Sequence, residues 1–319
     1  MTDTAADEAR DGAAIDAGQG TRAGFVALIG APNAGKSTLV NSLVGRKVSI
    51  VTHKVQTTRA NIRGIRVHEA GNTRAQIVFV DTPGIFQPRR RLDRAMVDAA
   101  WTGAKDADCV TLLIDAERGI GEDTARILER LRDVPLPRVL LVNKIDRVRP
   151  ETLLALTAEA NAACAFDATF MVSALNGDGL PDYLDWLGAN LPVSPFLYPD
   201  EEVSDLPPRI MAAEVTREKV FLRLHQELPY NAHVETEGWQ ERRDGSLRVE
   251  QVIYVARDAH KKIVLGRGGQ TIKAISQAAR KELTELLGRP VHLFLFVKVR
   301  ENWVDDPERY REMGLDFPR

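Results

Sequence analysis

Features that mark several protein classes are scarce in this sequence. Its two cysteines, Cys109 and Cys164, are too few for a disulfide framework and are typical of a reducing compartment. No apolar run approaches the roughly 18 residues that a membrane-spanning helix needs. The first residues lack the basic flank and apolar core of a signal peptide. We therefore expect a cytoplasmic protein.

Charge and composition are close to average. The formal net charge is −2, so bulk charge neither indicates nor excludes a nucleic-acid partner. Hydrophobic residues make up 44% of the chain and charged residues 28%, which excludes a mostly disordered, collagen-like or coiled-coil protein. At about 150 residues per domain, 319 residues predict two domains.

An α/β pattern occupies the first half of the chain. Residues 1–22 are mostly small or acidic and free of aromatic residues, which predicts a disordered tail. From Gly24 onward, apolar runs alternate with helix-like stretches, as in a mostly parallel sheet buried on both faces. Residues 62–69 alternate in polarity and are expected to form a hairpin with 75–81. The other predicted strands are 24–30, 109–115, 138–144 and 168–174, and the predicted helices are 36–45, 90–105, 120–133, 150–163 and 180–190.

A second unit follows a proline-rich segment. Residues 191–208 hold five prolines and four acids, and they predict an exposed linker. Beyond it the order helix, strand, strand, helix, helix, strand is predicted, at 216–228, 232–239, 247–256, 259–265, 270–286 and 291–299. The mixed-charge segment 298–311 is expected to dock on this second unit.

A glycine-rich loop after the first strand carries the clearest chemistry. It matches G-x-x-x-x-G-K-[ST] at every fixed position and opens a helix, which is the context of a phosphate-binding loop. The backbone N–H groups of such a loop surround phosphates, Lys36 reaches the β- and γ-phosphates, and Ser37 binds Mg²⁺. The predicted nucleotide-binding residues here are Gly30, Ala31, Pro32, Asn33, Ala34, Gly35, Lys36, Ser37 and Thr38.

Three later motifs lie at strand ends, where ligands bind in such sheets. Asp81 is expected to hold Mg²⁺, and Gly84 lets the backbone approach the γ-phosphate. Asp146 can accept hydrogen bonds from N1–H and the amino group of guanine, which adenine lacks, so it selects GTP over ATP. The backbone after Ser173 can contact the guanine carbonyl. The predicted nucleotide-binding residues of these motifs are Asp81, Thr82, Pro83, Gly84, Ile85, Asn143, Lys144, Ile145, Asp146, Ser173, Ala174 and Leu175.

Together and in this order, the motifs resemble the guanine-nucleotide-binding domain of translation-factor-like small GTPases. The resemblance places the switch I threonine, which closes on Mg²⁺ and the γ-phosphate, at Thr57 or Thr58, and we favour Thr58. It implies catalytic roles for Lys36, Thr58 and Gly84, with Ser37, Thr58 and Asp81 around Mg²⁺.

The chain departs from Ras-like GTPases after its Asp-x-x-Gly motif. Those enzymes have glutamine there, whereas this chain has Ile85, whose alkyl side chain cannot orient water. A subset of related enzymes binds K⁺ through an asparagine at the place of Asn33, so K⁺ is a candidate second cofactor that would supply charge. Arg59 is an alternative source of charge, although we expect it to be solvated.

A GxxG turn between two predicted helices marks the second unit. Within this element order it resembles a type II KH domain, which clamps about four nucleotides through the backbone of that loop. Residues 257–300 hold ten lysines or arginines against three acids, a local net charge of +7. The predicted RNA-binding residues are Lys261, Lys262, Gly266, Arg267, Gly268, Gly269 and Lys273.

The combination of these two units resembles the Era family. Further sequence segments that match this family are Glu227-Leu228-Pro229-Tyr230, Pro290-Val291-His292-Leu293 and Trp303. The resemblance covers all of the chain except the tail predicted at 1–22. With it, we expect a GTPase domain at 23–190, a linker at 191–208, a type II KH domain at 209–300 and a C-terminal extension at 301–319.

The resemblance also implies a function. We expect a GTP-hydrolysing switch, slow without an activator, that binds 16S rRNA near its 3′ end and acts in assembly of the 30S ribosomal subunit, as a monomer. Two alternatives stay open. One is a nucleotide-stabilised RNA chaperone with negligible hydrolysis. The other is a GTPase acting on another RNA or peripherally at the inner face of the cell membrane.

Overall fold

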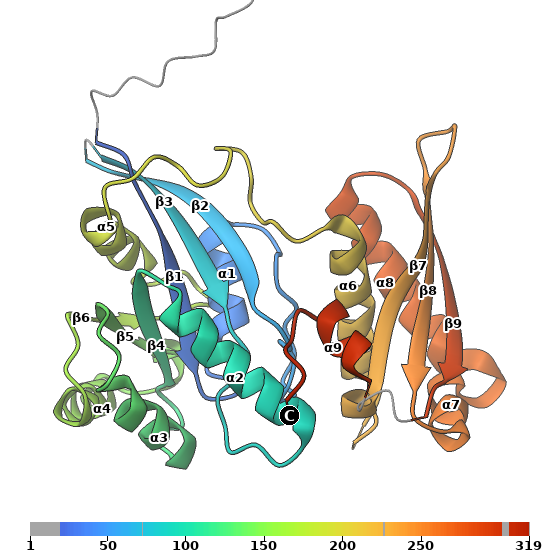
Figure 1. Cartoon of the computed structure of the whole chain (residues 1–319), viewed down its shortest axis with the longest axis horizontal. Coiled ribbons are helices and arrows are strands. Elements are labelled where there is room, and N and C mark those ends of the chain that lie inside the picture. The colour runs from blue at the N-terminus through green and yellow to red at the C-terminus, as the bar shows by residue number, and fades with distance from the viewer. Residues whose placement is uncertain (1–19, 72, 226, 302–305, 319) are drawn as a thin grey trace, which may run out of the picture.

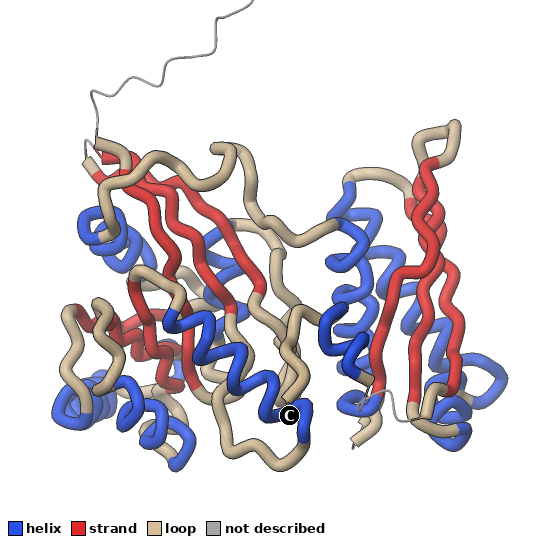
Figure 2. The backbone as a smooth tube through the Cα atoms, in the orientation of Figure 1, coloured by secondary structure: helices blue, strands red, loops and turns tan. Residues whose placement is uncertain are grey.

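The computed structural model describes residues 20–71, 73–225, 227–301 and 306–318. Residues 1–19 of the predicted tail and Trp303 lie outside the described residues. The described chain forms two lobes, and Figure 2 shows their strands as two separate groups. None of the helices in the described part of the chain has the length and hydropathy that a membrane span requires.

The first lobe is built on a six-stranded sheet in the order β2-β3-β1-β4-β5-β6. All neighbouring strands are parallel except the β2–β3 hairpin, which confirms the predicted α/β pattern. β1 begins at Arg22, two residues before its expected start at Gly24. The strands are β1 (Arg22–Gly30), β2 (Ile62–Ala70), β3 (Thr73–Asp81), β4 (Cys109–Asp115), β5 (Arg138–Asn143) and β6 (Ala168–Val172).

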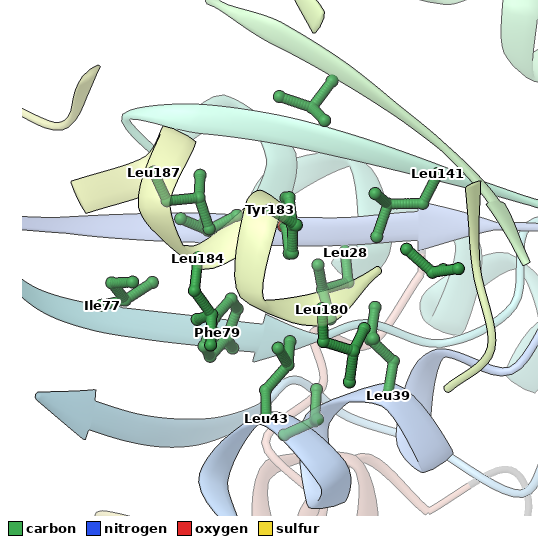
Figure 3. Packing of buried hydrophobic residues seen from close by; sticks show 14 of the residues in the cluster. Leu28, Leu39, Leu43, Ile77, Phe79, Leu141, Leu180, Tyr183, Leu184 and Leu187 are labelled. Carbon is green, nitrogen blue, oxygen red and sulfur yellow. The ribbon is translucent and has the colours of Figure 1, made fainter. Parts of the chain in front are cut away.

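Five helices cover both faces of this sheet (Figure 1). Their bounds are α1 (Lys36–Val44), α2 (Arg91–Lys105), α3 (Glu122–Leu131), α4 (Pro150–Ala163) and α5 (Leu180–Asn190). α1 and α5 pack on one face, where Leu39, Leu180 and Tyr183 meet Leu28 and Phe79 of the strands (Figure 3). α2, α3 and α4 cover the other face. Burial on both faces explains why the central strands read as continuous apolar runs.

The second lobe has the predicted order of elements. Its sheet runs β7-β8-β9, with β7 antiparallel and β9 parallel to β8. The elements are α6 (Pro208–Arg223), β7 (Ala232–Glu241), β8 (Leu247–Val255), α7 (Asp258–Leu265), α8 (Gln270–Leu287) and β9 (Val291–Val299). A final short helix, α9 (Pro307–Glu312), follows.

The first helix of this lobe differs from its prediction. The periodicity of Val220, Leu222, Leu224 and Leu228 predicts a helix over 216–228, but α6 spans Pro208–Arg223. Proline is favoured in the first helical turn, where its missing N–H costs nothing, so Pro208 starts the helix early. Leu222 is half exposed, and Leu224 already has an extended backbone. The expected spacing therefore mixed core and surface positions.

The segment between the lobes, residues 191–208, is hydrogen-bonded to strands of the first lobe. The backbone N–H groups of Leu197 and Tyr198 donate to the buried Gln76 side chain at 2.7 and 2.9 Å. The N–H of Ile65 donates to the carbonyl of Val203 at 2.9 Å. This segment thus follows the β3 and β2 side of the first sheet (Figure 1).

The C-terminal segment contacts both lobes. Arg309 pairs with Glu235 of β7, which fits the expected docking on the second unit. Tyr310, however, is fully buried in a cluster with Leu92 and Met96 of α2 in the first lobe. In Figure 1, α9 accordingly lies between α2 and the second lobe. The segment thus contacts the second unit, as expected, and in addition the first lobe.

Candidate functional site

The glycine-rich loop joins β1 to α1 as predicted. Gly35 ends it with φ +103°, and a Cβ there would come within 2.3 Å of Asn143 Nδ2, so no other residue fits. The Lys36 ammonium lies inside the loop and donates to the carbonyl oxygens of Gly30 and Ala31 at 3.1 and 3.3 Å. Burial lowers the pKa of Lys36 to about 8, partly opposed by Asp81. The loop therefore places the positive charge of Lys36 where we expect the phosphates of a nucleotide.

Three hydroxyl groups meet at the Asp81 carboxylate. Its Oδ2 accepts from Ser37 Oγ at 2.7 Å, Ser49 Oγ at 2.6 Å and Thr58 Oγ1 at 3.2 Å. Burial raises the pKa of Asp81, and hydrogen bonds from Ser49 and the charge of Lys36 oppose that rise. Its other oxygen, Oδ1, is buried without a hydrogen-bond partner among the described residues. These oxygens are the ligand type that Mg²⁺ prefers.

The cluster separates the two threonine candidates. The Thr58 hydroxyl lies 2.9 Å from Ser37 Oγ and is buried, whereas Thr57 Oγ1 contacts Thr52 Oγ1 at 2.5 Å instead. The preference for Thr58 therefore has a geometric basis. Sequence reasoning missed Ser49, because it belongs to no motif and lies 32 residues from Asp81.

The Asn143–Asp146 motif follows β5 and connects to the phosphate loop. Asn143 Nδ2 donates to the carbonyl of Ala34 at 2.8 Å, and its Oδ1 accepts from the N–H of Ala174 at 2.9 Å. The Asp146 carboxylate accepts from Ser173 Oγ at 2.7 Å, which fixes its orientation. Asn143 thus joins the phosphate loop to the 173–175 loop.

Lys144 is held by a residue that sequence reasoning missed. Its ammonium donates to Asp115 Oδ2 at 2.6 Å and to the carbonyl of Asn33 at 2.9 Å. Asp115 ends β4 just as Asp81 ends β3, so its place at a strand end was the available signal. The pair fixes the lysine stem beside the expected guanine position.

A cavity of about 300 Å³ connects these groups. The predicted residues that line it are Pro32, Asn33, Gly35, Lys36, Ser37, Thr38, Thr58, Gly84, Asn143, Lys144, Asp146, Ala174 and Leu175. Residues 50–56 and Arg147 also line it, although they were not predicted individually, and so does Thr57, the less favoured switch I candidate. The remaining predicted residues, which neighbour this lining in the sequence, are Gly30, Ala31, Ala34, Asp81, Thr82, Pro83, Ile85, Ile145 and Ser173.

Two further predicted residues have informative positions. The Ile85 side chain is buried in the core with Ala27 and Ile29, so only its backbone faces the loop, and its N–H donates to the carbonyl of Gly30 at 3.1 Å. Asn33 has φ +64°, and its side-chain amide contacts the carbonyl oxygen of His53 at 3.1 Å. Asn33 therefore joins the phosphate loop to residues 50–57.

Arg59 is not solvated as expected. Arg59 is 4% exposed, and its side chain contacts backbone carbonyls of the second lobe, including Ala232 at 3.1 Å. Burial and the nearby Arg217 lower its pKa to about 9. The expectation failed because its partners are carbonyl groups 170 or more residues away, which leave no charge pattern in the sequence.

The GxxG residues of the second lobe form a turn between α7 and α8. Lys262, Arg267, Gly268 and Lys273 are exposed there, while Lys261 and Gly266 are partly covered. A Cβ on Gly268 or Gly269 would meet no atom within 4 Å. A backbone open on this side, flanked by cations, suits a phosphodiester chain.

Comparison with known proteins agrees with both lobes. The sequence model of a family described as "50S ribosome-binding GTPase" matches residues 25–144, and that of the KH domain matches residues 227–304. The GTPase Era of Rhizobium meliloti (strain 1021) is 66% identical over 319 residues, covering 100% of both chains. The GTPase Era of Agrobacterium fabrum is 67% identical over 299 residues, covering 94% of this chain and 93% of that protein.

Two solved structures are also similar over most of their length. One is Era in complex with MgGDPNP and nucleotides 1506–1542 of 16S ribosomal RNA, with a TM-score of 0.86 and 36% identity, covering 92% of this chain and 99% of the other. The second is a single-residue variant of Aquifex aeolicus Era bound to GDP·AlF4⁻, with the same TM-score and coverage and 35% identity. The chain belongs to the Era family, and it is a GTPase with a C-terminal KH domain.

Proposed function

We propose that this GTPase binds 16S rRNA near its 3′ end and acts as a switch in assembly of the 30S ribosomal subunit. The observation that carries the proposal is the similarity to the Era that was solved with both MgGDPNP and that RNA, which extends over 92% of this chain. The exposed, cationic GxxG turn supports it independently. We propose the domain limits 23–190 and 209–300, joined by 191–208.

At the nucleotide site, this chain's own residues bind and orient GTP. Lys36 and the amides of residues 30–38 stabilise charge on the β- and γ-phosphates, while the backbone of Gly84 faces the γ-phosphate. Asp146 pairs with the guanine edge, and Lys144 covers the ring. Ile85 leaves the attacking water without a glutamine-like partner, so unstimulated hydrolysis is slow.

Mg²⁺ fits the oxygen cluster at Asp81. Ser37, Thr58 and Asp81 would hold it, and the unpartnered Asp81 Oδ1 supports this assignment. When bound there, Mg²⁺ would neutralise negative charge on the phosphates of the nucleotide.

K⁺ has a candidate place between Asn33 and the carbonyl of His53, which already face one another. An amide oxygen and a backbone carbonyl are the ligand type this ion takes, and a half-turn of the Asn33 amide presents its oxygen there. When bound there, K⁺ would supply positive charge near the phosphates.

RNA binding is proposed to centre on Gly266, Arg267, Gly268 and Gly269, with Lys261, Lys262 and Lys273 meeting phosphates. The test is the affinity of labelled RNA from the 3′ end of 16S rRNA, measured with a GTP analogue, with GDP and against scrambled RNA. Selective binding that is stronger with the GTP analogue supports the switch. Equal affinity for both RNAs would contradict rRNA recognition, and equal affinity in both nucleotide states would contradict the switch.

Phosphate release separates the proposed function from its alternatives. Measurable hydrolysis that small ribosomal subunits accelerate supports the switch. An absence of hydrolysis with and without subunits would favour a chaperone whose nucleotide only stabilises it. Acceleration by other RNAs, or sedimentation with anionic vesicles instead of subunits, would move the site of action elsewhere.

A further inference from the structure

We propose that Arg217, on helix α6 of the KH domain, is a positioning residue for GTP hydrolysis in the other domain. It would act by holding the backbone of switch I, residues 46–61, so that Thr58 faces the Mg²⁺ site. This inference rests on the proposed roles of Thr58 and Mg²⁺ and deepens them: the catalytic arrangement of the GTPase domain is completed from the KH domain.

The central contact lies one residue before the switch threonine. Arg217 Nη2 donates to the carbonyl oxygen of Thr57 at 2.5 Å. The next side chain, Thr58, lies 2.9 Å from Ser37 Oγ and 3.2 Å from Asp81 Oδ2. Because a carbonyl and the following residue share one peptide unit, displacement of the Thr57 carbonyl displaces Thr58 as well.

Arg217 is itself rigidly held. Its side chain is 1% exposed, and its Nε donates to Glu214 Oε1 on the same helix at 2.7 Å. The guanidinium also lies over the Phe221 ring, 5.2 Å from the ring centre. A buried, charge-paired arginine loses few additional conformations when it binds a carbonyl, so it suits a positioning role.

The same helix holds the beginning of switch I. Glu218 Oε1 accepts from the N–H of Val51 at 2.9 Å, and Glu218 Oε2 pairs with Lys47 at 2.7 Å. The Glu218 side chain is 5% exposed. Two adjacent residues of α6 therefore hold the two ends of the switch I segment that lines the nucleotide cavity: Glu218 contacts Val51, and Arg217 contacts Thr57.

Switch I also reaches back into the KH domain. Arg59 donates to the carbonyl of Ala232, and Lys54 donates to the carbonyls of Phe221 and Leu224, the latter at 2.6 Å. Thr58 thus lies next to two contacts between the domains. Arg217 of α6 donates to the carbonyl of Thr57, and Arg59 of switch I donates to the carbonyl of Ala232.

These contacts predict how a disturbance of α6 changes nucleotide affinity and turnover, and both effects can be measured. Thr58 serves the Mg²⁺ and γ-phosphate state, so loosening it should weaken binding of a GTP analogue and turnover, but not binding of GDP. Coupling between two binding sites is reciprocal. If a ligand that moves α6 changes the affinity for GTP by some factor, GTP therefore changes the affinity for that ligand by the same factor.

The test compares Arg217→Met with Arg223→Met. Arg223 is on the same helix but is exposed at its last residue, away from the Thr57 and Val51 contacts of Arg217 and Glu218. We expect Arg217→Met to lower kcat about tenfold, because small misplacements of catalytic groups have large effects. It should weaken affinity for a GTP analogue, raise the Mg²⁺ concentration needed for half-maximal rate and leave GDP affinity within about twofold of the parent. Arg223→Met should match the parent, and Arg217→Lys, which keeps one donor, should recover part of the rate.

A folded Arg217→Met with unchanged kcat would overturn the proposal. So would an equal loss of affinity for GDP and for the GTP analogue, because that result indicates only a structural role. If Arg217→Met does not fold, Glu218→Gln serves as the second variant, with the same expected pattern and the same overturning results. All these readouts omit RNA, so failure of the parent protein to bind 16S rRNA would contradict the proposed function and leave this test intact.

Discussion

Lys36, whose charge we propose stabilises the phosphates, lies where burial disfavours its protonated form. Its pKa of about 8 reflects burial in a loop whose phosphates are the natural partner of its ammonium. Nucleotide phosphates stabilise the protonated form, so binding raises this pKa. Below about pH 8 the lysine is already protonated, and above it binding must take up a proton.

We therefore predict that GDP affinity is nearly constant from about pH 7 to 8 and then falls, by up to about tenfold per pH unit. Titrations with a fluorescent GDP analogue measure this. Lys36→Arg is the matched control, because arginine keeps its charge throughout: its affinity should be weaker but should lack the extra fall. Parallel pH profiles for the two proteins would show that Lys36 does not titrate in this range.

The proposed selection of guanine also depends on a single residue. Asp146 is oriented by the Ser173 hydroxyl at 2.7 Å and lines the cavity. Asp146→Asn replaces one acceptor with a donor that opposes the guanine amino group. We expect GTP affinity to fall about 100-fold or more, since each unpaired group costs about 1–3 kcal/mol. Xanthosine triphosphate, with a carbonyl in place of the amino group, should bind the variant better than GTP does. The same preference for GTP in the variant and the parent would contradict this role.

Single residues were predictable where a motif fixes their spacing. Lys36, Ser37, Asp81 and Asp146 belong to such motifs, and the structure brings all four to one site. Ser49 and Arg217 were not singled out, and Arg59 was expected in solvent, because each acts through a partner remote in sequence. An isolated serine or arginine has no local signature of such a contact.

At the scale of elements, the GxxG turn offers a clean test. We predict that Gly268→Asp lowers affinity for the 16S rRNA fragment by about tenfold or more, because it puts an anion where phosphates approach. Basal GTP hydrolysis should be unchanged, since the turn contributes no residue to the lining of the nucleotide cavity. Filter binding and phosphate release measure the two effects.

Gly245→Asp is the matched control for this variant. Both glycines have left-handed backbones, φ +59° and +80°, and a Cβ on either would meet no atom within 4 Å. Gly245 lies in the β7–β8 turn rather than beside α7. If both variants lose RNA affinity equally, the GxxG turn has no special role.

The bounds of helices and strands were predicted well where a single hydrophobic periodicity continues between clear boundary signals in the sequence. α4, α5 and β9 begin and end at the predicted residues. α6 was misplaced, because it packs on its own sheet and also on switch I, so its buried face is too wide for a single periodic stripe. Its buried Arg217 and Glu218 read as surface residues in the sequence.

At the scale of the whole molecule, the arrangement of the two domains could not be predicted. Several contacts between them join side chains to backbone carbonyls, which every residue carries, so no pairing of residue types reveals them. The C-terminal segment adds a second connection: Arg309 pairs with Glu235 of the KH domain, while Tyr310 is buried against α2 of the GTPase domain. α2 follows the Asp81–Gly84 motif, so this connection reaches the helix just after one of the predicted nucleotide-binding motifs.

Tyr310 should therefore stabilise α2 from outside the GTPase domain. The ring is fully buried with Leu92 and Met96 and packs edge-on against Phe317, 4.9 Å between ring centres. Truncating such a ring costs about 3–5 kcal/mol when the site cannot collapse. We predict that Tyr310→Ala speeds amide hydrogen exchange in α2 by up to about 100-fold, while α5, on the opposite face of the sheet, is unchanged. Phe296→Ala, which removes an exposed ring from β9, is the control. Unchanged exchange in α2 would mean that the C-terminal segment rests on the GTPase domain without supporting it. Faster exchange confined to α2 would mean that the C-terminal segment supports this helix of the GTPase domain through the buried Tyr310 ring.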